Sequence, residues 1–271
     1  MTNKRIAVIM CTCVFDKSEY LSIAIDSILN QSFPCDILIL KNGSLTADLE
    51  NVFSAYSLKS NVIVLDSDMN FGLAKGLNIL IDYAIESGYD FIARMDSDDI
   101  SRPSRLEKQV NYFNSHPEVD VLGTSCHEFG ASFALNEKHL PTNHVELERF
   151  SITRCPFVHP TVMFKIDVFK DGVRYPESTF LTEDMALWLE MLSLGYRFSN
   201  INEILLDYRL NESTICRRKG MKKALSEVVI RVKYMFILRK LTFGNFLLIF
   251  ARFFFHLSPS ILIRYAYRRL R

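Results

Sequence analysis

Apolar runs of six to eight residues alternate with amphipathic stretches through the first hundred residues of the chain. The runs are rich in isoleucine, valine and leucine, which is typical of strands buried on both faces of a sheet. The stretches between them repeat apolar side chains every three or four positions, which predicts helices. The pattern predicts strands over 5–12, 35–41, 61–66 and 90–95, and helices over 18–31, 46–57 and 73–87. Strands and helices in this alternation indicate βαβ units and a parallel sheet flanked by helices.

The pattern is less regular after residue 100. It predicts helices over 102–117 and 182–195, and strands over 119–126, 158–165 and 203–210, the last of which closes the core. Pro103 suits the first turn of the first of these helices, and Thr182 suits the cap of the second.

The first twenty residues superficially resemble a signal peptide, because Lys4 and Arg5 precede an apolar run. No small-residue cleavage site follows that run, and Asp16 and Lys17 come at once. We therefore favour a first buried strand over a signal peptide.

Composition fits one α/β domain of ordinary size with an appendage. The chain has 271 residues, of which 49% are hydrophobic and 23% are charged. Its six cysteines form neither a CxxC pair nor a spacing typical of disulfides. We interpret them as reduced thiols, mostly buried, in a cytoplasmic protein.

The net charge of +1 hides a strong asymmetry along the chain. Residues 217–271 contain 14 lysines and arginines and a single acid, Glu227, so this segment carries +13 and residues 1–216 carry −12. This change predicts a globular domain over 1–216 and a basic, aromatic-rich tail over 217–271. The apolar core of this tail is interrupted by Arg252 and Pro259, which disfavours a helix that spans a membrane. Two amphipathic helices in the membrane interface fit better, and a re-entrant or protein-packed segment is the alternative.

Polar clusters follow three of the predicted strands. They are Asn42-Gly43-Ser44, Asn70-Phe71-Gly72 and Asp96-Ser97-Asp98. Parallel sheets bind ligands beyond the carboxyl ends of their strands, so we expect one site at this edge.

The three aspartates at positions 96, 98 and 99 repel one another unless a cation holds them. A solvated acidic loop is one interpretation. A calcium loop of the EF-hand type requires a glycine that this segment lacks. A haloacid-dehalogenase phosphohydrolase requires its aspartates after the first strand, where Cys11-Thr12-Cys13 stands. The remaining interpretation is a divalent cation, Mn²⁺ or Mg²⁺, that bridges the carboxylates to a diphosphate.

Several segments together resemble glycosyltransferase family 2. They read DILILKNGS, NFGLAKGLN, FIARMDSDDISRPSRLEKQ, HPTVMF and TEDMALWLEML. The resemblance covers roughly residues 4–216. Within the family, the chain most resembles the bacterial exopolysaccharide, capsule and O-antigen transferases. It implies a GT-A fold with a Rossmann-like, mostly parallel sheet. It also implies a nucleotide-sugar donor, a divalent metal and inversion at the anomeric carbon.

The resemblance implies roles at the donor side. Asp96 and Asp98 match the motif that contacts the ribose and the metal, and Asp99 is either a further carboxylate of the metal site or a surface acid before a helix. Asn42 stands where many members read uracil, and Thr12 stands where the family often has a hydroxyl or aromatic contact to the base.

Four further residues match donor-side elements of the family less specifically. Asn70, Gly72 and Asn78 match a donor-side turn, or form an ordinary strand-to-helix turn. Arg94 either offsets the charge of the aspartates or forms a structural ion pair.

On the acceptor side, Asp184 matches the catalytic base and Glu183 its neighbour in the Glu-Asp motif. Acids in a first helical turn also stabilise the helix, which is the alternative for both. His159 could bind the metal, bond a substrate or fix a turn. Arg209, Arg217 and Arg218 could hold a diphosphate, and the last two could instead face a membrane.

We therefore expect an inverting, metal-dependent hexosyltransferase. The resemblance implies a UDP-sugar donor, and an undecaprenyl-diphosphate saccharide acceptor on the cytoplasmic leaflet of the inner membrane fits the tail. We expect peripheral association with that leaflet and no nucleic-acid partner. A non-catalytic nucleotide-sugar-binding or scaffold protein of polysaccharide assembly is the alternative.

Overall fold

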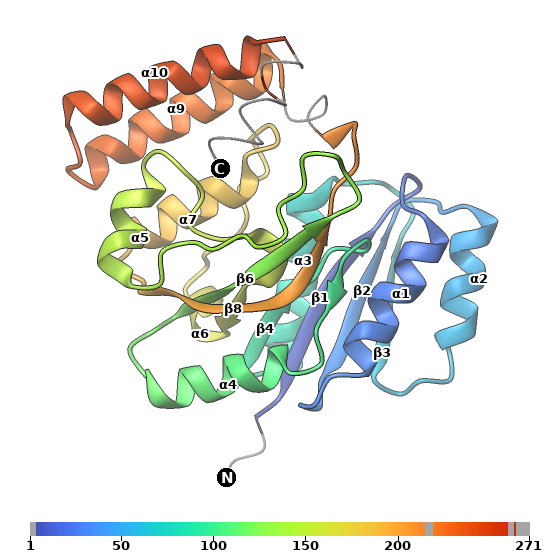
Figure 1. Ribbon diagram of the computed structural model, residues 1–271. Helices are drawn as coiled ribbons and strands as arrows, with labels where there is room; N and C mark the ends of the chain where they lie inside the picture. The colour runs from blue at the N-terminus through green and yellow to red at the C-terminus, as the bar shows by residue number, and fades with distance from the viewer. Residues whose placement is uncertain (1–3, 215–218, 260–262, 264–271) are drawn as a thin grey trace.

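The structure of the protein is a computed structural model that describes residues 4–214, 219–259 and 263 (Figure 1). Its strands are β1 (Ile6–Thr12), β2 (Asp36–Asn42), β3 (Val62–Ser67), β4 (Phe91–Arg94), β5 (Ile100–Ser101), β6 (Val121–Phe129), β7 (Met163–Lys165) and β8 (Phe198–Arg209). They form one sheet in the order β3-β2-β1-β4-β7-β6-β8-β5. The pairs β1–β2, β2–β3, β1–β4 and β6–β8 are parallel, and the other three are antiparallel. The predicted α/β fold with a mostly parallel sheet is confirmed.

Helices flank this sheet on both faces (Figure 1). They are α1 (Ser18–Leu29), α2 (Ala47–Tyr56), α3 (Leu73–Glu86), α4 (Arg105–Ser115), α5 (His144–Ser151), α6 (Asp167–Lys170), α7 (Glu183–Ser193), α9 (Met221–Ile237) and α10 (Phe243–Leu257), with the short 3₁₀ helix η1 (His159–Thr161). One apolar cluster joins the sheet to α3 and α7, and a second joins it to α1, α2 and α4.

The alternation of β1 divides its side chains between these two clusters. Ile6, Val8 and Met10 belong to the cluster that contains α1, whereas Ala7 and Ile9 belong to the cluster that contains α3. All five side chains are buried. The first apolar run is therefore a central strand buried on both faces, as its composition predicts.

The second half of the chain departs from the predicted elements in several places. The predicted strand 158–165 begins as η1, because Pro160 has no N–H to donate to a sheet, and pairing with β4 starts only at Met163. Pro103 lies before the N-cap of α4 rather than in its first turn. Strand β8 begins five residues before the predicted start, and the short elements β5, α5 and α6 were not predicted. The five described cysteines are free, but only Cys126 is fully buried.

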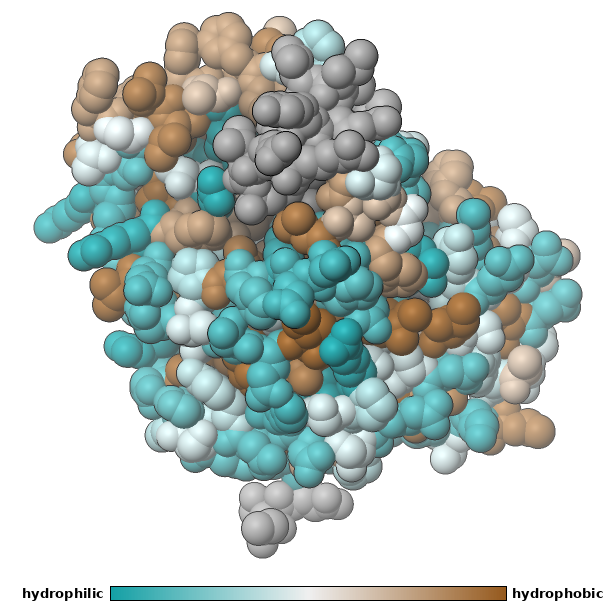
Figure 2. Space-filling model, in the orientation of Figure 1, coloured by the Kyte–Doolittle hydropathy of each residue, from teal (hydrophilic) through white to brown (hydrophobic). Residues whose placement is uncertain are grey.

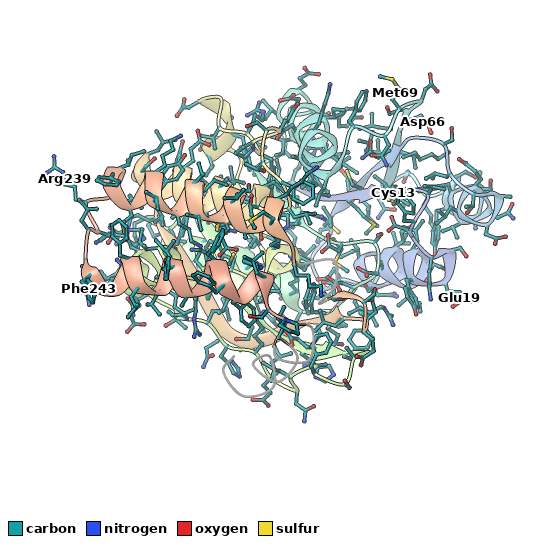
Figure 3. The ribbon with its side chains drawn as sticks, turned by 90° about the horizontal axis from the view of Figure 1, so that it is seen from above. Cys13, Glu19, Asp66, Met69, Arg239 and Phe243 are labelled. Atoms are coloured by element: carbon teal, nitrogen blue, oxygen red, sulfur yellow. The ribbon has the colours of Figure 1, made fainter. Side chains whose placement is uncertain are left out.

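The helices α9 and α10 form a hairpin that lies against α7 (Figure 1). Tyr234 and Met235 of α9 pack on Met185 and Leu189 of α7, in a cluster that also includes Ile249 of α10. Viewed from above, the two helices lie side by side, and the turn marked by Arg239 and Phe243 is far from the rim marked by Cys13 and Asp66 (Figure 3). In the described part of the chain, no helix has the length and apolar character that crossing a bilayer requires.

A buried charge cluster joins the hairpin to the rest of the protein. Glu227, the single acid of the segment, accepts hydrogen bonds from Arg231 at 2.8 Å and from Arg252, and pairs with His256 at 2.7 Å. Arg231 also donates to the carbonyl oxygens of Ser151 and Ile152 at 3.0 and 2.8 Å. Burial alone would raise the pKa of Glu227, but the His256 bond and the two arginines lower it well below its usual value. The acid therefore stays ionised and neutralises cations that come from both helices.

We predict that Glu227→Gln destabilises the fold by about 3–5 kcal/mol, because buried Arg231 loses its counter-charge. The matched control is Glu203→Gln, whose partner Lys108 lies at the surface and whose loss should cost less than about 1 kcal/mol. Urea unfolding measures both. The contribution of Glu227 should be complete above its unfolded pKa of about 4.5 and should decrease as the pH falls below that value. Equal unfolding midpoints for the parent and Glu227→Gln would contradict the prediction.

Candidate active site

The predicted turns after β2 and β3 meet at the carboxyl edge of the sheet. Asn42, at the end of β2, accepts a hydrogen bond from the N–H of Phe71 at 2.8 Å and donates to the carbonyl of Gly72 at 3.0 Å. Asn70 accepts from the N–H of Gly72 at 2.9 Å. Gly43 has a φ of +89°, and a Cβ there would lie 3.0 Å from the nitrogen of Asn70. These contacts fix the strand-to-helix turn before α3, and a role of Asn42 in reading a base stays a prediction.

The end of β1 lies beside this turn and beside the aspartates. Gly76 of α3 faces Cys11, and a Cβ there would lie 2.5 Å from its sulfur, so glycine allows α3 to approach β1. Burial raises the pKa of Cys11 to about 12, and the charges of Arg94 and Asp96 also act on this thiol. Thr12 is buried, and its hydroxyl has no hydrogen-bond partner among the described residues. A polar atom of this kind at the sheet edge is available to a ligand.

Asp96, Asp98 and Asp99 form one cluster at the end of β4. Each offers a carboxylate oxygen, and these oxygens lie within 4.8 Å of one another. Asp99 is fully buried and accepts from the N–H of Arg209 at 2.7 Å, while its other oxygen has no partner among the described residues. Burial, and then the charges of Asp96 and Asp98, raise the pKa of Asp99 well above its usual value. Three carboxylate oxygens this close could hold a hard divalent cation.

Arg94 is the protein's own cation for this cluster. Its guanidinium is buried and pairs with Asp96. Burial opposes its charge, but Asp96 and further anionic groups raise the pKa of Arg94. Arg105 of α4 donates to the carbonyl of Arg94 at 2.8 Å, which fixes the end of β4. The ion pair between Arg94 and Asp96 is structural, and it also offsets part of the aspartate charge. It therefore fits both alternatives that the sequence left open for Arg94.

Arg209 holds the aspartate loop from the end of β8. Its guanidinium lies 3.8 Å from the ring centre of Tyr20 and 4.4 Å from that of Phe129, so it is stacked between two aromatic rings. Its Nε donates to the carbonyl of Asp98 at 2.8 Å. A contact between Arg209 and a diphosphate stays a prediction, as do the roles of Arg217 and Arg218, which lie outside the described residues.

His159 bonds a tyrosine that sequence reasoning missed. Its Nε2 lies 2.8 Å from the hydroxyl of Tyr175, and burial followed by the charge of Arg94 lowers the pKa of His159 well below its usual value. Asn78 fixes the tyrosine backbone, because it accepts from the N–H and donates to the carbonyl of Tyr175 at 2.8 and 2.9 Å. The carboxylate cluster of the described residues does not include His159. The bond to Tyr175 is a contact within the protein, and a role of His159 toward a metal or a substrate stays a prediction. Tyr175 follows no periodic pattern, so only its neighbours in space reveal it.

Glu183 and Asp184 begin α7. Burial raises the pKa of Tyr175, and the charges of Arg94, Asp184, Asp96 and Glu183 all act on its hydroxyl. The base candidates and Asp96 of the aspartate cluster therefore lie near one buried phenol. Asp184 accepts from the N–H of Met185 at 2.7 Å, and burial, followed by the charge of Asp184, raises the pKa of Glu183.

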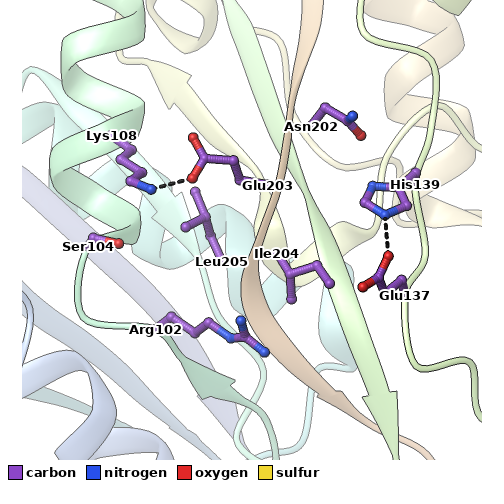
Figure 4. A pocket seen from close by; sticks show the side chains of 9 residues that line it. All are labelled: Arg102, Ser104, Lys108, Glu137, His139, Asn202, Glu203, Ile204 and Leu205. Atoms are coloured by element: carbon purple, nitrogen blue, oxygen red, sulfur yellow. Dashed lines mark hydrogen bonds and ion pairs between the residues drawn. The ribbon is translucent and has the colours of Figure 1, made fainter.

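A shallow surface hollow lies elsewhere, between α4, β8 and the loop before α5 (Figure 4). The ion pairs Lys108–Glu203 and His139–Glu137 lie along it. None of the predicted site residues lines it, so the hollow adds nothing to the site at the sheet edge.

The fold and the aspartate-bearing edge define a glycosyltransferase of the GT-A class. Residues 8–173 match glycosyl transferase family 2, and the chain belongs to this family. It is 30% identical to an uncharacterized glycosyltransferase of Haemophilus influenzae, across 97% of this chain and 98% of that protein. It is also 30% identical to the UDP-Gal:alpha-D-GlcNAc-diphosphoundecaprenol beta-1,3-galactosyltransferase of Escherichia coli, across 98% and 96%.

Solved structures share the fold at low sequence identity. Staphylococcus aureus TarS 1–349 in complex with UDP-GlcNAc superposes with a TM-score of 0.66 at 19% identity, across 85% of this chain and 66% of that one. The mannosyltransferase PcManGT of Pyrobaculum calidifontis, in complex with GDP-Man and Mn²⁺, gives 0.61 at 14% identity, across 97% and 84%.

Proposed function

We propose that this glycosyltransferase moves a hexose or N-acetylhexosamine from a UDP-sugar to an undecaprenyl-diphosphate-linked saccharide, with inversion, in cell-surface polysaccharide synthesis. The observation that carries the proposal is that the three-carboxylate cluster, through Asp96, and the Glu183–Asp184 pair both lie near the phenol of Tyr175. Inversion needs a leaving-group site and a base on opposite sides of the reacting carbon, and no carboxylate nucleophile. The whole-length similarity to the Escherichia coli galactosyltransferase supports the donor and acceptor classes.

The aspartates suit a divalent cation at the donor side. Asp98 and Asp96 would hold it, and the unpaired buried oxygen of Asp99 supports a further contact. When bound, Mn²⁺ or Mg²⁺ supplies positive charge against the diphosphate of the donor. Arg94 stabilises the carboxylates from within the protein.

Asp184 is the proposed base. It takes the proton from an acceptor hydroxyl while that oxygen bonds to the anomeric carbon of the donor sugar. The bond from that carbon to the diphosphate breaks on the opposite face, so UDP leaves and the configuration inverts. Tyr175 is buried beside these groups, and its hydroxyl is hydrogen-bonded to His159.

A membrane contact of the hairpin accounts for the many apolar side chains that are exposed on it. Of the 23 large apolar side chains that are exposed in the described part of the chain, thirteen lie from Met221 to Leu257, far more than a free surface normally carries. Figure 2 shows hydrophobic residues gathered over this hairpin. The cations Lys222 and Lys233 are exposed on α9, and Arg239 is exposed in the turn between the two helices. Apolar side chains rimmed by cations fit an anionic bilayer surface, which supports peripheral association with the cytoplasmic leaflet.

The metal proposal predicts that UDP binds more tightly with Mn²⁺ than with a chelator, and that Asp98→Ala abolishes the difference. Asp207→Ala, an acid of β8 that pairs with Arg102 instead, should keep it. Calorimetric titration of UDP measures each affinity. Equal affinity with and without metal in the parent protein would rule the proposal out.

For the base, we predict that Asp184→Asn lowers turnover by about 10²- to 10⁴-fold while the affinity for UDP is kept, because the amide preserves shape and removes basicity. Glu183→Gln should cost less, and Glu190→Gln, later in the same helix, should cost little. Product mass is measured with a panel of UDP- and GDP-sugars and synthetic lipid-diphosphate acceptors. If Asp184→Asn keeps parental turnover while Glu183→Gln is inactive, the base is Glu183. A parent without turnover would favour the alternative of a nucleotide-sugar-binding scaffold.

The membrane proposal predicts that the full chain co-sediments with phosphatidylglycerol vesicles and less with phosphatidylcholine vesicles. High salt should weaken the binding because it screens the cations. Replacing Phe243, Phe246 and Phe250 by serine should weaken it about tenfold or more, whereas serine at Leu58, Val145 and Leu194, which are equally exposed elsewhere, should not. We change side chains rather than remove the hairpin because α9 is part of the core. Binding that resists salt and carbonate would instead indicate a deeply embedded segment.

A further inference from the structure

The loop before the proposed base is strained and exposed. Leu181 has a φ of +54°, a conformation that side chains with a Cβ rarely adopt, and it is one of only two non-glycine residues with positive φ in the described chain. Phe180 and Leu181 are each 47% exposed. Backbone strain of this kind persists only where surrounding contacts impose it.

Ser226 of α9 supplies contacts that hold this loop. Its hydroxyl lies 2.7 Å from the hydroxyl of Thr182 and accepts from the N–H of Phe180 at 3.2 Å. Thr182 is the N-cap residue of α7 and is buried, yet its side chain makes no hydrogen bond to its own helix. The predicted cap is therefore replaced by a bond to another helix. The first turn of α7, which carries Glu183 and Asp184, depends on α9 for this contact.

The position of Ser226 is itself fixed. One residue further along α9, Glu227 enters the buried charge cluster, and one turn later Arg231 bonds the carbonyls at the end of α5. Tyr234 and Met235 then pack on Met185 and Leu189 of α7. A hydroxyl on so constrained a helix can set the position of the loop rather than follow it.

We propose that Ser226 is a positioning residue for the transfer step, through which the C-terminal hairpin sets the orientation of the Glu183–Asp184 turn toward the acceptor. The inference rests on the proposed function, because Asp184 is the base only in that reaction. It also joins the base and the hairpin in one rigid unit. The same hairpin that we propose to contact the membrane then orients Asp184.

A purely structural role and a positioning role differ in what they change. Loss of stability lowers the thermal midpoint and, with it, the binding of UDP on the far side of the site. Loss of positioning lowers kcat and leaves the affinity for UDP, the donor KM and vesicle binding at parental values. Misplacement of a catalytic group by about 1 Å can cost roughly 10²-fold in rate.

The test compares Ser226→Ala, Ser226→Thr and the control Ser258→Ala, whose hydroxyl bonds only a carbonyl of its own helix among the described residues. We expect Ser226→Ala to lower kcat about 10- to 100-fold, Ser226→Thr to restore most of it, and Ser258→Ala to leave it unchanged. Amide hydrogen exchange over residues 180–185 should rise in Ser226→Ala alone. Thr182→Val should lower kcat similarly, and the double variant should be no slower than either single one, because both remove one bond.

Three results would overturn the inference. They are parental kcat in Ser226→Ala, unchanged exchange over residues 180–185, or a loss of UDP affinity equal to the loss of turnover. If the parent is active while Ser226→Ala behaves like it, only this inference fails. If the parent transfers no sugar from any donor, the proposed function fails with it.

Discussion

The ion pair between Arg94 and Asp96 is the constraint on which the site depends. Three carboxylates within four residues repel one another when ionised, and a cation beside them reduces that repulsion. Arg94 supplies that charge from inside the sheet, and its backbone is held in turn by Arg105, which Gln109 bonds at 3.2 Å. Gln109 then donates to the carbonyls of Leu122 and Thr161. One polar chain thus runs from α4 through the core to the aspartates, and breaking any link would leave a buried charge or amide unpaired.

The sheet and its functional edge could be predicted because each depends on local pattern. Apolar runs gave the first four strands within one or two residues, and the polar turns after them meet where parallel strands end. Residues whose role depends on distant partners could not be read in this way. Arg209 is stacked between Tyr20 and Phe129, which are far from it in sequence, and Tyr175 acquires its place only through Asn78 and His159. Periodicity carries no information about such contacts.

The C-terminal segment shows the same limit for charge. Its excess of cations and aromatic residues was evident in the sequence, and so was its single acid. Only the fold reveals that Glu227 binds Arg231 and His256 in the interior and pairs with Arg252, which stays partly exposed. Arg231 therefore cannot face a membrane. What remains outside is a mainly apolar face with a few lysines and arginines, which suits shallow insertion beside anionic headgroups better than purely electrostatic attraction.

Helix α7 explains how the proposed base can be held in place between the sheet and the C-terminal hairpin. Seven of its eleven residues are buried, so the helix is packed on several sides and its movement is restricted. Trp188 stacks on Phe164 of the sheet at 5.6 Å and lies edge-on to His159, while Met185 and Leu189 meet the hairpin. Contacts with the sheet set how far the proposed base lies from the sheet edge, and contacts with the hairpin set its rotation about the helix axis. A transfer reaction gains most from such double fixation, because the base, the acceptor oxygen and the anomeric carbon must align before the proton moves.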